Sequence, residues 1–139
     1  MKKTIIFLIC LFLIIVTSIY AFYQSRQSEV ASISKFNHQY EIYMNRELKA
    51  NDIVTLINKV SDENKKLEAN DAENLNGIVV MLKFQDVDKV YEMSDLLKAG
   101  LDKFRESFEY STFKVVECTY NSYKKIEKIL IEEISYGNI

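Results

Sequence analysis

Residues 2–23 read KKTIIFLICLFLIIVTSIYAFY, and this stretch decides how the rest of the chain is organised. From Thr4 to Tyr23 the run is apolar apart from Cys10, Thr17 and Ser18. A helix needs roughly 20 apolar residues to cross the hydrocarbon core of a bilayer, and this run has that length. It therefore predicts a transmembrane helix.

The flanks of the apolar run predict its orientation. Lys2 and Lys3 stand before it, while Tyr20, Phe22 and Tyr23 cluster at its far end. Tyrosine and other aromatic residues gather at membrane–water interfaces, and Lys or Arg next to a span favours the cytoplasmic side. We therefore expect the N-terminus in the cytoplasm and the remainder of the chain outside the cell membrane.

Three parts follow from this orientation. Residues 1–3 are a cytoplasmic N-terminus, residues 4–23 a signal-anchor helix whose partner is the lipid bilayer, and residues 24–139 an extracytoplasmic domain. The competing interpretation is a signal peptide that is cleaved after Ala21. The apolar run is longer than the h-region of about 7–15 residues that such peptides carry, which favours a retained anchor.

Composition limits the class of the exported part. The chain has 139 residues, enough for one small domain after the anchor. Of its 18 Lys and Arg residues, Lys2 and Lys3 precede the apolar run, which leaves 16 against 20 Asp and Glu. No basic patch favours nucleic acid. Cys10 lies in the predicted span and Cys118 in the domain, so the two cannot form a disulfide within one chain.

Helical periodicity continues directly after the apolar run. Apolar residues recur three or four positions apart, with no Gly or Pro before them, at Val30, Ile33, Phe36, Tyr40 and Tyr43. This stripe predicts one long helix that passes from the membrane into the domain, with Phe36 in the core. We expect a second helix from an Asn51 N-cap to about Lys66, with Ile53, Leu56, Ile57 and Val60 on its inner face.

The second half of the chain alternates between strand and helix patterns. We expect strands over 78–84 and 89–93, joined by a turn, and strands over 112–120 and 125–134. Between the two pairs, Ser94 is the expected N-cap of a helix to about Ser107. Its apolar stripe would be Leu97, Leu101, Phe104 and Phe108. The sequence thus predicts an α+β domain with two further helices and an antiparallel sheet of about four strands.

Few residues offer chemistry. His38 is the only histidine, and with Glu41 alone beside it a metal site is not expected. Residues 70–77 resemble a calcium-binding loop only in composition. If Gly77 were the glycine at position 6 of an EF-hand loop, Ala72 and Lys83 would stand at positions 1 and 12, where an Asp and a Glu are required. Cys118 reads as a packed residue. We therefore expect no catalytic, cofactor-binding or metal-binding residues, no cofactor, and no enzymatic activity.

Two stretches carry a resemblance. The patterns FNxxYExY at 36–43 and DIVTLINKV at 52–60, followed by Asn64, resemble a group of small, uncharacterised, membrane-anchored proteins of clostridial and related Gram-positive bacteria. The resemblance implies an N-terminal membrane helix and an exported domain, and it implies no activity. The plan of a hydrophobic helix that continues into an α+β domain also resembles type IV pilin-like proteins.

These observations lead to two functional hypotheses. The first is a single-pass, membrane-anchored, extracytoplasmic interaction or structural module of the bacterial cell envelope, with an envelope protein as partner. The alternative is a pseudopilin-like component of a secretion or DNA-uptake machine. Pilin-like proteins carry a Gly at the processing site and a Glu early in the apolar run, and this run has neither.

Overall fold

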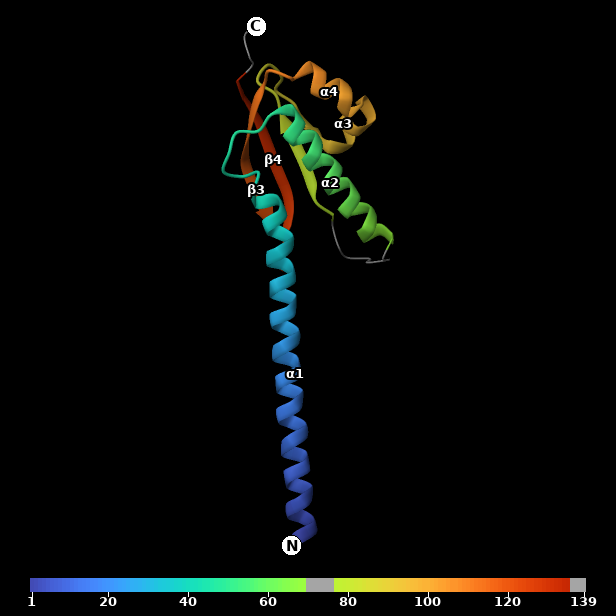
Figure 1. Ribbon diagram of the computed structural model, residues 1–139, viewed down its shortest axis with the longest axis vertical. Coiled ribbons are helices and arrows are strands. Elements are labelled where there is room, and N and C mark those ends of the chain that lie inside the picture. Colours follow the sequence, from blue (N-terminus) through green and yellow to red (C-terminus); the bar gives the residue numbers. More distant parts are fainter. Residues whose placement is uncertain (70–76, 136–139) are drawn as a thin grey trace. The chain divides into compact units, whose positions relative to one another are not determined.

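The computed structural model describes residues 1–69 and 77–135, and the chain divides into two compact units, residues 1–36 and residues 37–139 (Figure 1). Helix α1 (Lys2–Glu41) forms the first unit, and its last turn begins the second. The long continuous helix expected from the sequence is confirmed. It ends at Glu41, a few residues before the expected end near Met44.

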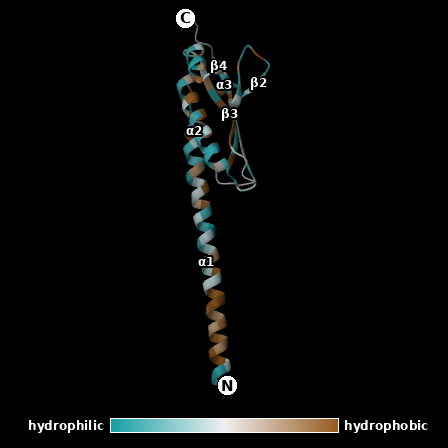
Figure 2. Cartoon of the chain, turned by 90° about the vertical axis from the view of Figure 1, so that its right-hand side faces the viewer, coloured by the Kyte–Doolittle hydropathy of each residue, from teal (hydrophilic) through white to brown (hydrophobic). Residues whose placement is uncertain are grey.

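The first unit presents an apolar surface. Every side chain from Met1 to Ser32 is exposed, and the N-terminal part of α1 is hydrophobic in Figure 2. Thr17 Oγ1 donates hydrogen bonds to the carbonyls of Leu13 and Ile14, both at 2.9 Å. Ser18 Oγ donates to the Ile14 carbonyl at 2.8 Å. Both hydroxyls are thus satisfied within the helix, as an apolar environment requires.

The second unit is an α+β domain, as the sequence predicts. After the last turn of α1 its elements follow in the order α2 (Ala50–Ala69), β1 (Val79–Lys83), β2 (Val90–Glu92), α3 (Met93–Ala99), α4 (Leu101–Ser107), β3 (Thr112–Tyr120) and β4 (Ile126–Ser135). The strand boundaries agree with the expected ones within one or two residues.

The four strands form one sheet in the order β2-β1-β4-β3. The two hairpins are antiparallel, but the central strands β1 and β4 run parallel. The sheet is therefore mixed, and it differs in this one pairing from the antiparallel sheet that was expected. A parallel neighbour requires a long connection, and here α3, α4 and β3 provide it.

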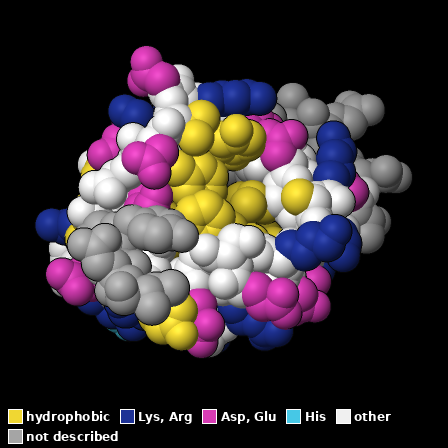
Figure 3. All heavy atoms as spheres, turned by 90° about the horizontal axis from the view of Figure 1, so that it is seen from above, with side chains coloured by type: hydrophobic (Ala, Val, Ile, Leu, Met, Phe, Trp, Pro, Cys, Tyr) yellow, Lys and Arg dark blue, Asp and Glu magenta, His cyan; other side chains and the backbone are white. Residues whose placement is uncertain are grey.

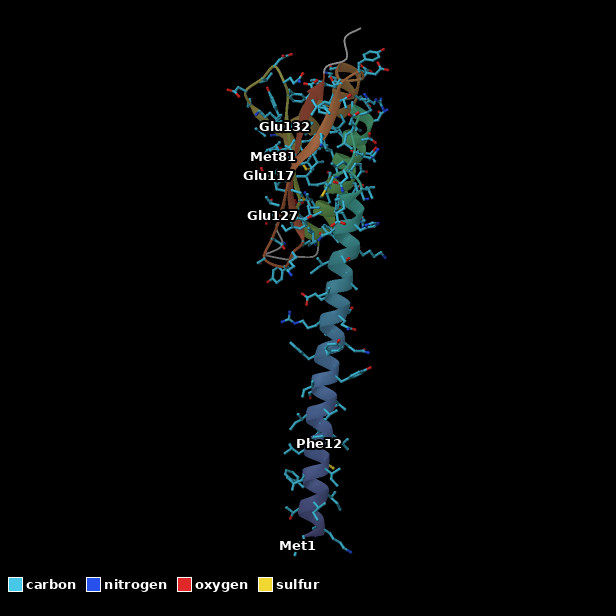
Figure 4. All side chains as sticks on the ribbon, turned by 90° about the vertical axis from the view of Figure 1, so that its left-hand side faces the viewer. Met1, Phe12, Met81, Glu117, Glu127 and Glu132 are labelled. Atoms are coloured by element: carbon cyan, nitrogen blue, oxygen red, sulfur yellow. The ribbon has the colours of Figure 1, made fainter. Side chains whose placement is uncertain are left out.

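One face of the sheet is covered and forms the core. Helix α2 lies over this face (Figures 1 and 4), and its apolar stripe is fully buried, as expected from the sequence. The opposing side chains come from alternate positions of the strands, and they are Val80, Leu82, Phe113, Val115, Ile129 and Ile131. The polypeptide before α2 also protects an edge, because Leu48 pairs with Phe113 of β3 through two backbone hydrogen bonds of 2.8 and 2.9 Å.

The opposite face of the sheet is open and carries charged side chains. Met81, Glu117 and Glu132 lie on it in Figure 4. Two ion pairs cross between neighbouring strands, Lys83 with Glu132 at 3.8 Å and Lys128 with Glu117 at 3.5 Å. An open face of mixed polarity is common for a sheet that is packed on one side only.

The single helix expected over 95–107 is two short helices. Gly100 separates them with a φ of 100°, a conformation that L side chains rarely adopt. Helix α3 begins at Met93 with Glu92 as its N-cap, so Ser94 is not the cap. The buried face of α3 also differs from the expected one. Leu96 is buried, whereas Leu97, which the expected stripe included, is 40% exposed.

Two further expectations need correction. Asn51 is inside α2, and the helix start is instead fixed by Asp52, whose carboxylate accepts a hydrogen bond of 2.9 Å from the Lys49 amide. The apolar stripe of α1 is buried only at its end. Tyr40 and Tyr43 belong to the core, whereas Phe36 is half-buried and is not a core residue. Residues 70–76, which resemble a calcium-binding loop only in composition, lie outside the described residues.

Two asparagine side chains hold the starts of the parallel strands. Asn37 donates from Nδ2 to the Lys124 carbonyl at 2.8 Å and accepts from the Ile126 amide at 3.0 Å. Asn64 of α2 donates from Nδ2 to the Ile78 carbonyl and accepts at Oδ1 from the Ile78 amide, both at 2.9 Å. Ile78 precedes β1 and Ile126 begins β4, so each helix is tied to one of the two central strands.

We expect Asn37→Ala to lower the stability of the domain. The substitution leaves the buried Ile126 amide without its acceptor, and a lost partner of a buried group costs about 1–3 kcal/mol. At about 4–8 °C per kcal/mol, the unfolding midpoint should fall by several degrees in thermal denaturation of the full chain in detergent micelles. His38→Ala is the control, since the His38 side chain is 79% exposed. Equal midpoints for the two variants would contradict this role of Asn37.

Gly77 offers a second test of the same arrangement. A methyl group at this position would overlap the Asn64 carboxamide, so Gly77→Ala should destabilise the chain by about 1–3 kcal/mol. In an Asn64→Ala background the obstruction is absent, and Gly77→Ala should then have little effect. Urea denaturation of the four chains in this double-mutant cycle measures the coupling. Additive effects would show that the two residues do not interact.

Candidate functional site

The titratable residues singled out in the sequence do not form a catalytic site. His38 is exposed and has Glu41 as its partner, with 3.9 Å between Nδ1 and Oε2. Cys118 is half-buried, and burial raises the pKa of its thiol, with the charge of Glu41 acting in the same direction. An activated cysteine needs the opposite shift. Among the described residues, no group of three or more His, Cys, Asp or Glu side chains could hold a metal ion.

Tyr40 is also unsuited to chemistry at neutral pH. Burial raises the pKa of its hydroxyl to about 12, and the negative charge of Glu63 adds to the effect. The side chain is fully buried between α1 and the domain core. Its hydroxyl therefore stays protonated at any physiological pH, and its role is packing.

A hollow lined by aromatic side chains is the clearest concave site of the domain. Phe84, Tyr91 and Phe108 form its walls, and the hollow has a volume of about 450 Å³. Phe84 stacks on Phe108 with 4.7 Å between ring centroids and meets Tyr91 edge-on at 5.6 Å. We call this site the aromatic hollow. Figure 3 shows hydrophobic side chains gathered at the centre of one face, with charged side chains around them.

The local sequence explains why the rings converge here. Phe84 directly follows β1, just before the turn at Gln85 and Asp86, and Tyr91 lies on β2. Phe108 follows α4, so the break at Gly100 decides where it lies. A second apolar hollow of about 310 Å³ adjoins the first and shares the rings of Phe84, Tyr91 and Phe108. Sequence analysis placed Phe108 on the apolar stripe of a helix and included Phe84 and Tyr91 only in expected strands.

A buried carboxylate lines the aromatic hollow. Glu133 of β4 is only 7% exposed. Its Oε1 accepts a hydrogen bond of 2.6 Å from the Ser111 hydroxyl, and its Oε2 accepts one of 3.2 Å from the Gln85 amide. Within residues 1–69 and 77–135, no Lys, Arg or His forms an ion pair with it. Sequence analysis placed Glu133 in a strand but gave no signal that it is buried.

Comparison with known proteins does not assign the chain to a family. Neither a protein-family model, nor a curated protein, nor a solved structure matches this chain. The class that the structure itself defines is a chain with one long apolar N-terminal helix and an α+β domain. By length and composition that helix is compatible with a membrane anchor, and none of its apolar part is buried.

The environment of Cys118 predicts slow and pH-dependent labelling. Because only the thiolate reacts and its pKa is raised, iodoacetamide should modify Cys118 of a Cys10→Ala chain far more slowly in the native state than in urea. The rate should rise with pH through and beyond the ordinary thiol range near 8.5. Glu41→Gln should accelerate labelling, because it removes a charge that disfavours the thiolate, and Glu127→Gln is the matched control. Fast native labelling at pH 7 would contradict the prediction.

Proposed function

We propose that the protein is a single-pass, membrane-anchored, extracytoplasmic binding module of the bacterial cell envelope. The observation that carries this proposal is the apolar half of α1. Residues 4–23 form an unbroken helix about 30 Å long at 1.5 Å per residue, which matches the hydrocarbon thickness of a bilayer. Its side chains are all exposed. In water this surface would be costly, since burial of apolar area is worth roughly 25 cal/mol per Å².

The end of the apolar stretch supports an interfacial position. Gln24 and Gln27 donate side-chain hydrogen bonds of 2.9 Å to the hydroxyls of Tyr20 and Tyr23. The Arg26 guanidinium lies 5.5 Å from the centre of the Phe22 ring. Aromatic rings with a polar tip are suited to the level of the lipid headgroups. Together with Lys2 and Lys3 at the other end, this favours a cytoplasmic N-terminus.

The domain supports binding rather than catalysis. Its concave site is aromatic, and burial raises the pKa of the Cys118 thiol, which disfavours the reactive thiolate. A tether to the membrane would confine the aromatic hollow to the neighbourhood of the bilayer and raise its effective concentration for ligands there. The resemblance to small membrane-anchored proteins of Gram-positive bacteria agrees with this compartment.

A reporter fusion tests the topology. Alkaline phosphatase, fused after Ile139 and active only when exported, should be active. Lys2→Gln with Lys3→Gln should lower that activity, because the charges that hold the N-terminus inside are removed. Lys65→Gln with Lys66→Gln removes the same charge from α2 and should leave the activity unchanged. An inactive fusion of the unsubstituted chain would overturn the proposed orientation.

The N-terminus of the mature protein tests retention of the anchor. We expect sequencing of the protein purified from membranes to begin at or next to Met1. A start at Phe22 would show cleavage as a signal peptide. Removal of only a few residues before Ile5 would instead favour the pilin-like alternative.

A further inference from the structure

The aromatic hollow is lined by a buried carboxyl group that forms no ion pair with a Lys, Arg or His among the described residues. Glu133 is more than nine-tenths buried, and its two hydrogen bonds come from a hydroxyl and a backbone amide. Burying a carboxylate without a cation costs several kcal/mol. Asp86, which also lines the hollow, adds a second carboxylate. Among the described residues that line this hollow, none is basic.

The aromatic rings that line the hollow also favour a ligand with a positive charge. The rings of Phe84, Tyr91 and Phe108 line the hollow, and the face of an aromatic ring attracts a cation within about 6 Å of the ring centroid. Tyr91 already shows this preference, because the ammonium group of Lys89 lies 5.0 Å from its centre. Lys89 is exposed and is not among the residues that line the hollow. A cation inside would therefore meet Glu133 and ring faces together.

The walls also require an apolar portion of the ligand. Val87 and the three rings leave room for a short hydrocarbon chain beside the carboxylate. The hollow has a volume of about 450 Å³, within the range of about 300–1,000 Å³ for small-molecule sites. A protein partner needs about 800 Å² of its own surface buried, which this concavity does not supply.

We propose that the aromatic hollow binds a small organic amine as its ammonium form, with the hydrocarbon part against Phe84, Tyr91 and Phe108 and the ammonium group at Glu133. This inference deepens the proposed function and rests on the hollow being its binding site. It does not depend on the membrane orientation. The ligand class follows from charge complementarity, because the ammonium group supplies a counter-charge that Glu133 does not receive from the described residues.

Gln85 provides a direct reporter, since its amide donates to Glu133. The full chain in dodecyl maltoside micelles, labelled with ¹⁵N-glutamine, gives backbone signals from Gln24, Gln27, Gln39 and Gln85. At pH 7 we expect butylammonium to shift Gln85 saturably and at least about tenfold more tightly than 1-butanol, its neutral counterpart, as a charge-assisted contact predicts. The other three signals should not move.

Substitutions distinguish the contribution of the Glu133 carboxylate to binding from that of the aromatic rings. Glu133→Gln should reduce the preference for butylammonium over 1-butanol to about twofold or less, while Glu127→Gln on the same strand should preserve it. Tyr91→Leu keeps an apolar side chain in the wall but removes an aromatic ring, so it should weaken the binding of butylammonium more than the binding of 1-butanol. The signal of Gln39, which belongs to the domain and whose carbonyl accepts a hydrogen bond from Lys59, reports whether each variant remains folded.

Three results would overturn the proposal. Equal affinities for butylammonium and 1-butanol would leave the hollow as a binding site but reject its cation preference. No shift of Gln85 by either compound up to 50 mM would reject the hollow as a small-molecule site, and the reporter fusion would still decide the anchor separately. Tighter binding of N-acetyl-lysine-N-methylamide than of butylammonium would assign the hollow to a protein side chain instead.

Discussion

The carboxamides of Asn37 and Asn64 hold the beginnings of the two central strands, and the rest of the domain depends on this arrangement. A strand that begins beside a helix has backbone groups without sheet partners, and a buried unpaired group is costly. Each asparagine satisfies an amide and a carbonyl at once. The last turn of α1 is thereby fixed to β4, and α2 is fixed to β1.

With the central strands fixed, their parallel pairing determines the two faces of the sheet. Alternate side chains of β1 and β4 point to the same side, so one face meets α2 and the other remains open. The connection from β2 back to β3 must then cross the end of the sheet, and α3 and α4 occupy that path. The aromatic hollow lies where this connection meets the β1–β2 turn, and Glu133 reaches it from β4.

The two units of the chain are stabilised by different surroundings. The domain buries its apolar stripe against its own sheet, which is the usual source of stability for an amphipathic helix. The side chains of residues 1–32 are all exposed in the structure, including those of the apolar run. Burial of this apolar surface in a bilayer would be favourable, so the helix is compatible with the proposed membrane anchor.

The sequence by itself determined the elements whose patterns are local. The apolar run, the stripe of α2 and the alternation of 112–120 each follow from periodicity, because a period of 3.6 or 2 is set by neighbouring residues. Tertiary structure alone decided the parallel pairing of β1 and β4, the break at Gly100, the burial of Asn37 and Glu133, and the contact of Asn64 with Ile78. These polar residues have no local signature of these contacts, since their partners Ile126, Ile78 and Ser111 are 89, 14 and 22 positions away along the chain. The hollow was not predictable for the same reason: its walls come from separate elements, and only the folded chain brings them together.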